Sequence, residues 1–205
     1  MKIGIMGGTF DPIHNGHLHL ARTALTQFDL DQIWFMPNGM PPHKKQSSIE
    51  SDIHERIAMT RIAIKANKQF YLQEYEAKRE KVSYSYKTME HFRKIYPDDE
   101  FYFIIGADSL FSIETWKHPE RLFKACIILA ACRDEAATKE SLNGQIQMLK
   151  GKYGAYIKFL AMPLEHVSSH EIRKLIESGE PVSEYIPAEV EAYIRKEGLY
   201  GSGNR

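Results

Sequence analysis

The sequence has no surplus of charge of either sign. Lys plus Arg and Asp plus Glu both total 27 among 205 residues, so the formal net charge at pH 7 is zero. Nonspecific affinity for nucleic acid comes largely from surplus basic charge. The balance therefore argues against a nucleic acid as the main partner, and any phosphate site has to be formed by local groups.

Cysteines and long apolar runs are also scarce. The two cysteines, Cys126 and Cys132, are too few and too close together to cross-link a secreted fold, so we expect them to be buried and reduced. The N-terminus, MKIGIMGG, reaches a glycine pair without the long apolar region of a signal peptide, and no stretch approaches membrane-spanning length. We expect a soluble, cytoplasmic protein with no membrane partner.

What the sequence does contain suits one compact domain over residues 1–205. With 43% hydrophobic and 11% aromatic residues, the chain can bury a full core. Short apolar, β-rich runs alternate with amphipathic segments, which predicts an α/β fold: a doubly wound, mostly parallel sheet with helices on both faces. There is no internal repeat and no low-complexity tract.

The pattern predicts six strands and seven helices. The strands are expected at Lys2–Met6, Gln32–Met36, Phe70–Glu74, Glu100–Ile105, Ile127–Ala131 and Ile157–Ala161. The helices are expected at His17–Gln27, Asp52–Asn67, Tyr86–Ile95, Pro119–Lys124, Lys139–Lys150 and Ser169–Ser178, with a last one opened by Pro187 and closed by Gly198. Two segments, Asn38–Ser51 and Arg133–Ser141, are predicted to be mobile surface, and the first is long enough to act as a substrate flap.

The turn after the first strand predicts a phosphate site. Gly7 and Gly8 let bare backbone approach a ligand, and the helix that follows offers unpaired N–H groups and a positive dipole end. His14 and His17 are three residues apart, so at a helix start both imidazoles can point the same way. Two aligned donors suit a phosphorus centre that gains negative charge.

Plainer interpretations of this turn exist. Gly7-Gly8 alone is also what a tight strand-to-helix turn requires. A zinc site on His14, His17 and His19 is the rival interpretation of the histidines, but no nearby cysteine or carboxylate set completes a tetrahedral shell. We therefore expect no dedicated protein metal site.

A second phosphate site is predicted after the sixth strand. Ser168 and Ser169 begin a helix, and Arg173 follows one turn later, so hydroxyls, helix N–H groups and a guanidinium come together. Such a site would hold the β- and γ-phosphates of a nucleotide. The alternative is an ordinary helix N-cap followed by a surface arginine.

Both segments resemble known signatures. The run GTFDPIHNGHL resembles that of the HxGH nucleotidylyltransferase superfamily, and VSSHEIR resembles its second signature, (I/V)SSTxxR, with His170 in place of the threonine. The resemblance implies a Rossmann-like fold in which His14 and His17 stabilise the α-phosphate in the transition state. It also implies ATP contacts along the glycine turn and the second signature, made by Gly7, Gly8, Thr9, Phe10, His17, Ser168, Ser169 and Arg173.

Four further segments resemble bacterial nicotinate mononucleotide adenylyltransferases. By this resemblance Lys44, in PNGMPPHKK, would reach the triphosphate, and the backbone of Ser85, in SYSYKT, would receive the pyridine carboxylate. Gly106 and Asp108, in GADS, would contact the ATP ribose, and the indole of Trp116 would stack on the nicotinate ring. The alternatives are a solvated loop lysine, an N-cap aspartate and a core tryptophan.

Lys87 replaces the aspartate of the family pattern, so its role is left unassigned. The closing IPAEVEAYIRKEGLY also resembles the family's C-terminal helix.

The resemblance implies a specific reaction. AMP would pass from ATP to nicotinate mononucleotide, giving nicotinate adenine dinucleotide and pyrophosphate, with His14, His17, Lys44 and Arg173 as the catalytic residues. Mg²⁺ would bridge the ATP phosphates. The alternatives are another acceptor, such as the amide mononucleotide or pantetheine phosphate, and a catalytically idle nucleotide sensor. A tRNA-synthetase-like activity fits less well, because there is no anticodon-binding domain. The sequence leaves the oligomeric state open, a homo-oligomer included.

Overall fold

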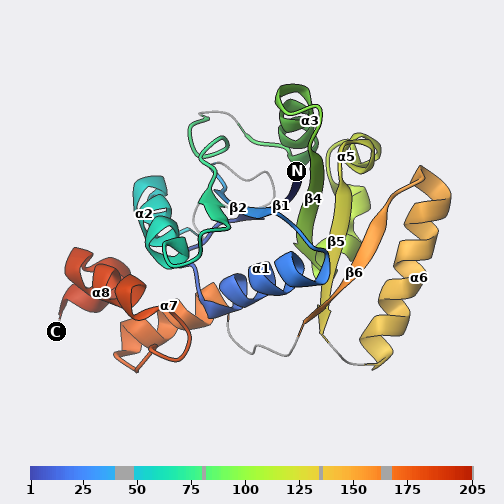
Figure 1. The fold of residues 1–205 in the computed structure, drawn as a ribbon. Helices are drawn as coiled ribbons and strands as arrows, with labels where there is room; N and C mark the ends of the chain where they lie inside the picture. Colours follow the sequence, from blue (N-terminus) through green and yellow to red (C-terminus); the bar gives the residue numbers. More distant parts are fainter. Residues whose placement is uncertain (40–48, 80–81, 134–135, 163–167, 205) are drawn as a thin grey trace. The chain divides into compact units, whose positions relative to one another are not determined.

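The computed structural model describes residues 1–39, 49–79, 82–133, 136–162 and 168–204 (Figure 1). Its six strands form one sheet in the order β3-β2-β1-β4-β5-β6. The pairs β1 with β4, β4 with β5 and β5 with β6 are all parallel. The predicted α/β class and the predicted number of strands are confirmed.

Every strand is followed along the chain by one or more helices. Their bounds are β1 Lys2–Gly8, α1 Asn15–Gln27, β2 Gln32–Pro37, α2 Ile53–Ile64, β3 Phe70–Leu72, α3 Ser85–Ile95, β4 Glu100–Gly106, α4 Ala107–Ser112, the 3-10 turn Ile113–Thr115, α5 Pro119–Ala125, β5 Ile127–Arg133, α6 Ala136–Tyr153, β6 Ile157–Met162, α7 Ser169–Ser178, α8 Ala188–Glu197 and the 3-10 segment Leu199–Asn204.

The strand order reverses between β1 and β4. The chain first runs outward from β1 through β2 to β3, then returns to place β4 on the other side of β1 and continues to β6. Parallel crossovers are right-handed, so a reversal of direction puts the connecting helices on both faces of the sheet. This is the doubly wound, Rossmann-like arrangement, in which ligands bind beyond the carboxyl ends of the strands near the reversal.

The chain forms two compact units that interleave in sequence. Unit 1 consists of Met1–Gly7, Leu20–Trp34 and Ser83–Leu164, and unit 2 of Gly8–His19, Phe35–Val82 and Glu165–Arg205. Because each unit is built from three separate segments, neither is a contiguous stretch of the sequence. That residues 1–205 act as a single domain stays a prediction.

The core of unit 1 is aromatic around Trp34. Its ring meets Phe92 edge-on at 5.3 Å and Phe101 at 6.0 Å between ring centroids, which confirms the prediction that Trp34 lies in the core. Cys126 and Cys132 are free and buried, also as predicted.

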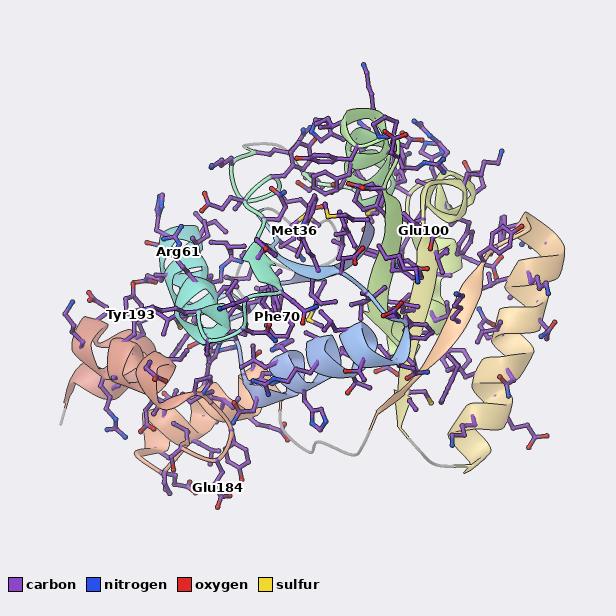
Figure 2. The ribbon with its side chains drawn as sticks, viewed as in Figure 1. Met36, Arg61, Phe70, Glu100, Glu184 and Tyr193 are labelled. Carbon is purple, nitrogen blue, oxygen red and sulfur yellow. The ribbon has the colours of Figure 1, made fainter. Side chains whose placement is uncertain are left out.

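The core of unit 2 forms around Phe35. The rings of Phe10 and Phe70 lie 6.0 and 5.0 Å from the ring of Phe35, and all three side chains are buried. Met36 on β2 and Phe70 on β3, both labelled in Figure 2, are buried core residues of this unit. The turn that carries the histidines is therefore anchored through Phe10.

Several predicted boundaries were wrong. β1 continues past the predicted last residue Met6 to Gly8, where Asn38 N donates to Gly8 O at 2.8 Å, so the strand ends in the glycine pair. In the predicted surface segment Arg133–Ser141, Arg133 instead ends β5 and residues 136–141 begin α6, in a stretch rich in the helix formers Ala, Lys and Glu. β3 ends at Leu72 instead of Glu74.

In the part of the chain that the structure describes, no helix is long and apolar enough to cross a membrane. The cytoplasmic location stays a prediction.

Candidate active site

The turn between β1 and α1 is shaped by Gly8 and Phe10. A Cβ added to Gly8 would lie 2.6 Å from the Phe10 ring, so only glycine fits above that ring. Phe10 has a left-handed backbone (φ 51°) and is 1% exposed. The buried ring of Phe10 thus supports the turn, and the backbone remains accessible at Gly8.

His14 and His17 lie together at the start of α1, as the sequence predicts. Their ring centroids are 3.7 Å apart with 36° between the ring planes. The backbone N–H of His14 donates to His17 Nδ1 at 3.2 Å. Because Nδ1 of His17 is an acceptor, the proton of its neutral ring lies on Nε2, which makes Nε2 a hydrogen-bond donor.

His14 is the more buried of the two imidazoles. Burial lowers the pKa of His14 to about 4, so this ring is neutral at pH 7. Its Nδ1 is buried, and no described residue makes a hydrogen bond to it. A buried polar atom of this kind is uncommon and calls for a partner.

Asp11, in the turn before His14, connects four segments of unit 2. Its carboxylate accepts from Tyr200 OH at 2.7 Å, Glu50 N at 2.8 Å and Ser51 N at 3.2 Å. Its backbone carbonyl accepts from Arg173 NH1 at 2.8 Å. Asp11 is only 2% exposed, so these bonds fix the turn firmly.

Helix α7 is tied to the same turn. Ser168 is its N-cap and forms a capping box with Glu171, accepting from Glu171 N at 3.2 Å and donating to Glu171 Oε2 at 2.7 Å. Hydrogen bonds from Ser168 lower the pKa of Glu171. The hydroxyl of Ser169 donates to Pro12 O at 2.9 Å. Both serine hydroxyls therefore have protein partners, and the N-cap interpretation of Ser168 is confirmed.

Arg173 is not the surface arginine of the alternative interpretation. It is 9% exposed, and besides the bond to Asp11 O, its Nε donates to Glu50 Oε1 at 2.6 Å. Asp11 Oδ2 lies 3.9 Å from NH1. The second signature thus places a buried guanidinium against the turn that carries His14 and His17.

Four residues of this cluster were not singled out by sequence reasoning: Asp11, Glu50, Arg56 and Tyr200. Arg56, 2% exposed, donates from NH1 to Thr9 O and Asn38 O, both at 2.8 Å. The sequence feature that could have identified Arg56 is its place on the apolar face of a helix, three residues before the core residue Met59. Glu50 and Tyr200 carry no such signal, because their contacts are far apart in sequence.

The remaining ATP candidates belong to unit 1. Gly106 is the N-cap of α4 and is exposed, and a Cβ added there would meet nothing within 4 Å. Asp108 is exposed in the first turn of α4. The suggestion that Asp108 is itself an N-cap was therefore wrong, which removes the competing role for its carboxylate.

The acceptor candidates are also in unit 1. Ser85 is the first residue of α3, whose N-cap, Tyr84, makes no side-chain cap. Trp116 is half-buried and meets Phe103 edge-on at 6.4 Å between ring centroids. Lys87, the departure from the family pattern, is exposed, with its Nζ 5.7 Å from the centre of the Tyr84 ring.

Two further residues, Gly7 and Lys44, were predicted to contact ATP. Gly7 is half-buried at the end of the β1 segment of unit 1. Lys44 lies outside the described residues. Their assignments stay predictions.

A doubly wound sheet with a glycine pair at the end of β1 and paired histidines in the turn that follows defines a class, the Rossmann-like nucleotidylyltransferases. Residues 5–175 match the model of the cytidylyltransferase-like family. The chain is 40% identical over 202 residues to a probable nicotinate-nucleotide adenylyltransferase of Clostridium kluyveri, covering 98% of this chain and 99% of that one. It is 44% identical over 199 residues to one of Carboxydothermus hydrogenoformans, covering 97% and 98%.

The fold is similar to that of the Plasmodium falciparum nicotinic acid mononucleotide adenylyltransferase complexed with NaAD. The TM-score is 0.79 at 22% identity, covering 98% of this chain and 97% of that one. The chain belongs to the cytidylyltransferase-like family and, within it, to the nicotinate-nucleotide adenylyltransferases.

Proposed function

We propose that this chain transfers AMP from ATP to nicotinate mononucleotide, with the α-phosphate held at His14 and His17. The observation that carries the proposal is the pairing of these two rings, 3.7 Å apart, beside a turn bonded to Arg173. Imidazole donors and a guanidinium placed together are what a developing negative charge on phosphate requires.

The chemistry is a single displacement. A phosphate oxygen of the mononucleotide attacks the α-phosphorus of ATP in line, and the bond from the α-phosphorus to the bridging oxygen of pyrophosphate breaks. The incoming oxygen is already anionic, so no protein nucleophile and no covalent enzyme intermediate are needed. The work of the protein is positioning and charge stabilisation.

The histidines act as hydrogen-bond donors in this proposal. The neutral ring of His17 presents Nε2–H, because its Nδ1 accepts from the backbone of His14. His14 is neutral through burial, so it would meet the phosphate as an uncharged ring. Uncharged donors avoid the cost of burying two cations side by side.

Arg173, together with the first-turn amides of α7, is assigned to the β- and γ-phosphates. The serine hydroxyls are bonded within the protein, and the Ser168 N–H donates to Glu171 Oε2 at 2.7 Å, so we assign Ser169 to ATP through its backbone N–H and Ser168 as the cap that orders the first turn of α7. Gly7, Gly8, Thr9 and Phe10 contribute backbone contacts, and Lys44 reaches the triphosphate.

In unit 1 we assign Gly106 and Asp108 to the ATP ribose. Ser85 and Trp116 are assigned to the acceptor, and the uncapped start of α3 supports the assignment of Ser85, because its first amides are open to a carboxylate.

Mg²⁺ would arrive on the ATP phosphates. Among the described residues no group of three or more His, Cys, Asp or Glu is arranged to hold a metal ion, and Mg²⁺ in nucleotide sites usually binds through substrate phosphates and retained waters. The ion would neutralise charge on the departing pyrophosphate.

The test is an assay with ATP and purified full-length chain, comparing nicotinate mononucleotide, its amide form and pantetheine phosphate. Pyrophosphate release and the dinucleotide product are measured together. Product from the acid form at the highest kcat/KM supports the proposal. ATP binding without pyrophosphate release from any acceptor would instead identify a nucleotide sensor, and preference for another acceptor would correct the substrate.

A further inference from the structure

Glu50 is the most exposed member of the Arg173 cluster. Its Oε1 accepts from Arg173 Nε at 2.6 Å, while the exposed fraction is 50% for the Glu50 side chain and 10% for that of Arg173. Within the described residues, Arg173 is the only side chain that bonds to the Glu50 carboxylate. Water can therefore replace Arg173 at Glu50 without breaking any other side-chain contact.

The second carboxylate near Arg173 behaves differently. Asp11 is buried, and its carboxylate accepts from one hydroxyl and two backbone N–H groups. The fold holds Asp11 in place whether or not Arg173 has another partner. Of the two anions, only Glu50 can leave at low cost.

A carboxylate and a phosphate compete for the same donors. Arginine binds both through N–H groups of one planar fork, and a phosphate of the triphosphate chain carries more charge. A buried guanidinium needs an anionic partner, which Glu50 provides in the structure. A phosphate that takes over this role displaces Glu50 from the Nε donor that it holds.

We infer that Glu50 competes with the phosphate chain of ATP for Arg173 and thereby sets the affinity of the chain for the nucleotide. The inference rests on the proposed function, which assigns Arg173 to the β- and γ-phosphates. Glu50 lies outside both signature segments, and neither phosphate signature assigns it a role.

The test compares Glu50→Gln with the unaltered full-length chain. Dissociation constants for inorganic tripolyphosphate and for ATP are measured by calorimetry without an acceptor. A neutral amide is a weaker acceptor for arginine than a carboxylate, so both constants should fall by about three- to tenfold. The KM for ATP should fall by a similar factor.

The matched control is Glu189→Gln. Glu189 is exposed in the first turn of α8 in the same unit, so this variant makes the same change of net charge away from Arg173. It should leave both constants unchanged. A thermal melt of each variant checks that the fold is kept, and Glu50→Ala replaces Glu50→Gln if the latter does not fold.

Unchanged or weaker tripolyphosphate binding in the Glu50 variant would overturn the inference, and weaker binding would show that Glu50 holds Arg173 in its working position. An equal gain in the Glu189 variant would also overturn it, because net charge alone would then explain the effect. Failure of the proposed function has a different signature, namely no dinucleotide from any acceptor with the unaltered chain.

Discussion

The hydroxyl of Tyr200 donates to Asp11 Oδ1 at 2.7 Å, which fastens the segment after α8 to the turn that carries His14 and His17. Burial and the nearby Asp11 charge raise the pKa of Tyr200, so the hydroxyl keeps its proton and remains a donor. Residues almost two hundred positions apart thus share one buried hydrogen bond. The C-terminal segment is part of the support of the candidate site.

Tyr200→Phe should therefore destabilise the fold. The variant removes one donor from a buried carboxylate, and hydrogen bonds to charged groups contribute about 1.5–3 kcal/mol. Urea denaturation followed by circular dichroism measures the free energy of unfolding. The loss should lie in this range.

Tyr193→Phe is the matched control for Tyr200→Phe. Tyr193 lies on α8 in the same unit and is labelled in Figure 2. Its hydroxyl makes no hydrogen bond within the described residues. Its replacement should change the free energy of unfolding by less than about 0.5 kcal/mol. Equal losses in the two variants would show that the Asp11 bond is not the cause.

His14 should make the stability of the fold depend on pH. The pKa of His14 is about 4 in the folded chain against the ordinary value of 6.5 in the unfolded chain, which therefore binds more protons between these values. The contribution of His14 to the free energy of unfolding is therefore fully present above pH 6.5 and is lost as the pH drops toward 4. The loss from this residue approaches about 3 kcal/mol at the acid end.

Urea titrations at pH 7.0, 6.0, 5.0 and 4.5 measure this dependence. His14→Gln, which cannot titrate, is the comparison, and the difference in unfolding free energy between the two chains should shrink or reverse as the pH falls. Parallel pH curves for both chains would exclude His14 as the source.

His17→Ala should lower turnover by on the order of a hundredfold or more, because a lost preorganised donor in a transition state typically costs that much. The thermal midpoint should fall only slightly, because His17 is half-buried and the variant also removes the acceptor of the His14 backbone N–H. The KM for ATP should rise less than kcat falls. Turnover equal to that of the unaltered chain would contradict the assignment of His17.

The sequence predicted the fold and the close approach of the two histidines because both depend on local patterns. Alternating apolar runs predict strands and helices, and a glycine pair with two histidines three residues apart predicts a phosphate turn. The close approach of the His14 and His17 rings follows from that spacing at a helix start. These inferences need no knowledge of distant contacts.

The partners of Arg173 could not be predicted in this way. Glu50 and Asp11 lie 123 and 162 residues from it in the sequence, and no periodicity connects them. For the same reason the sequence could not show that both serine hydroxyls near the start of α7 bond within the protein. Long-range side-chain pairing is decided by packing, which the local pattern does not encode.

Trp116→Ala tests the acceptor site separately from the phosphate site. If the indole stacks on the pyridine ring, its loss should raise the KM for nicotinate mononucleotide by about three- to tenfold, the scale of an aromatic contact, and leave the KM for ATP unchanged. Trp116→Phe should recover part of the affinity. Phe111→Ala, at an exposed aromatic of α4, is the control and should change neither KM. A parallel rise of both KM values in Trp116→Ala would instead mean that Trp116, which meets the buried Phe103, supports the fold of unit 1 and does not contact the acceptor.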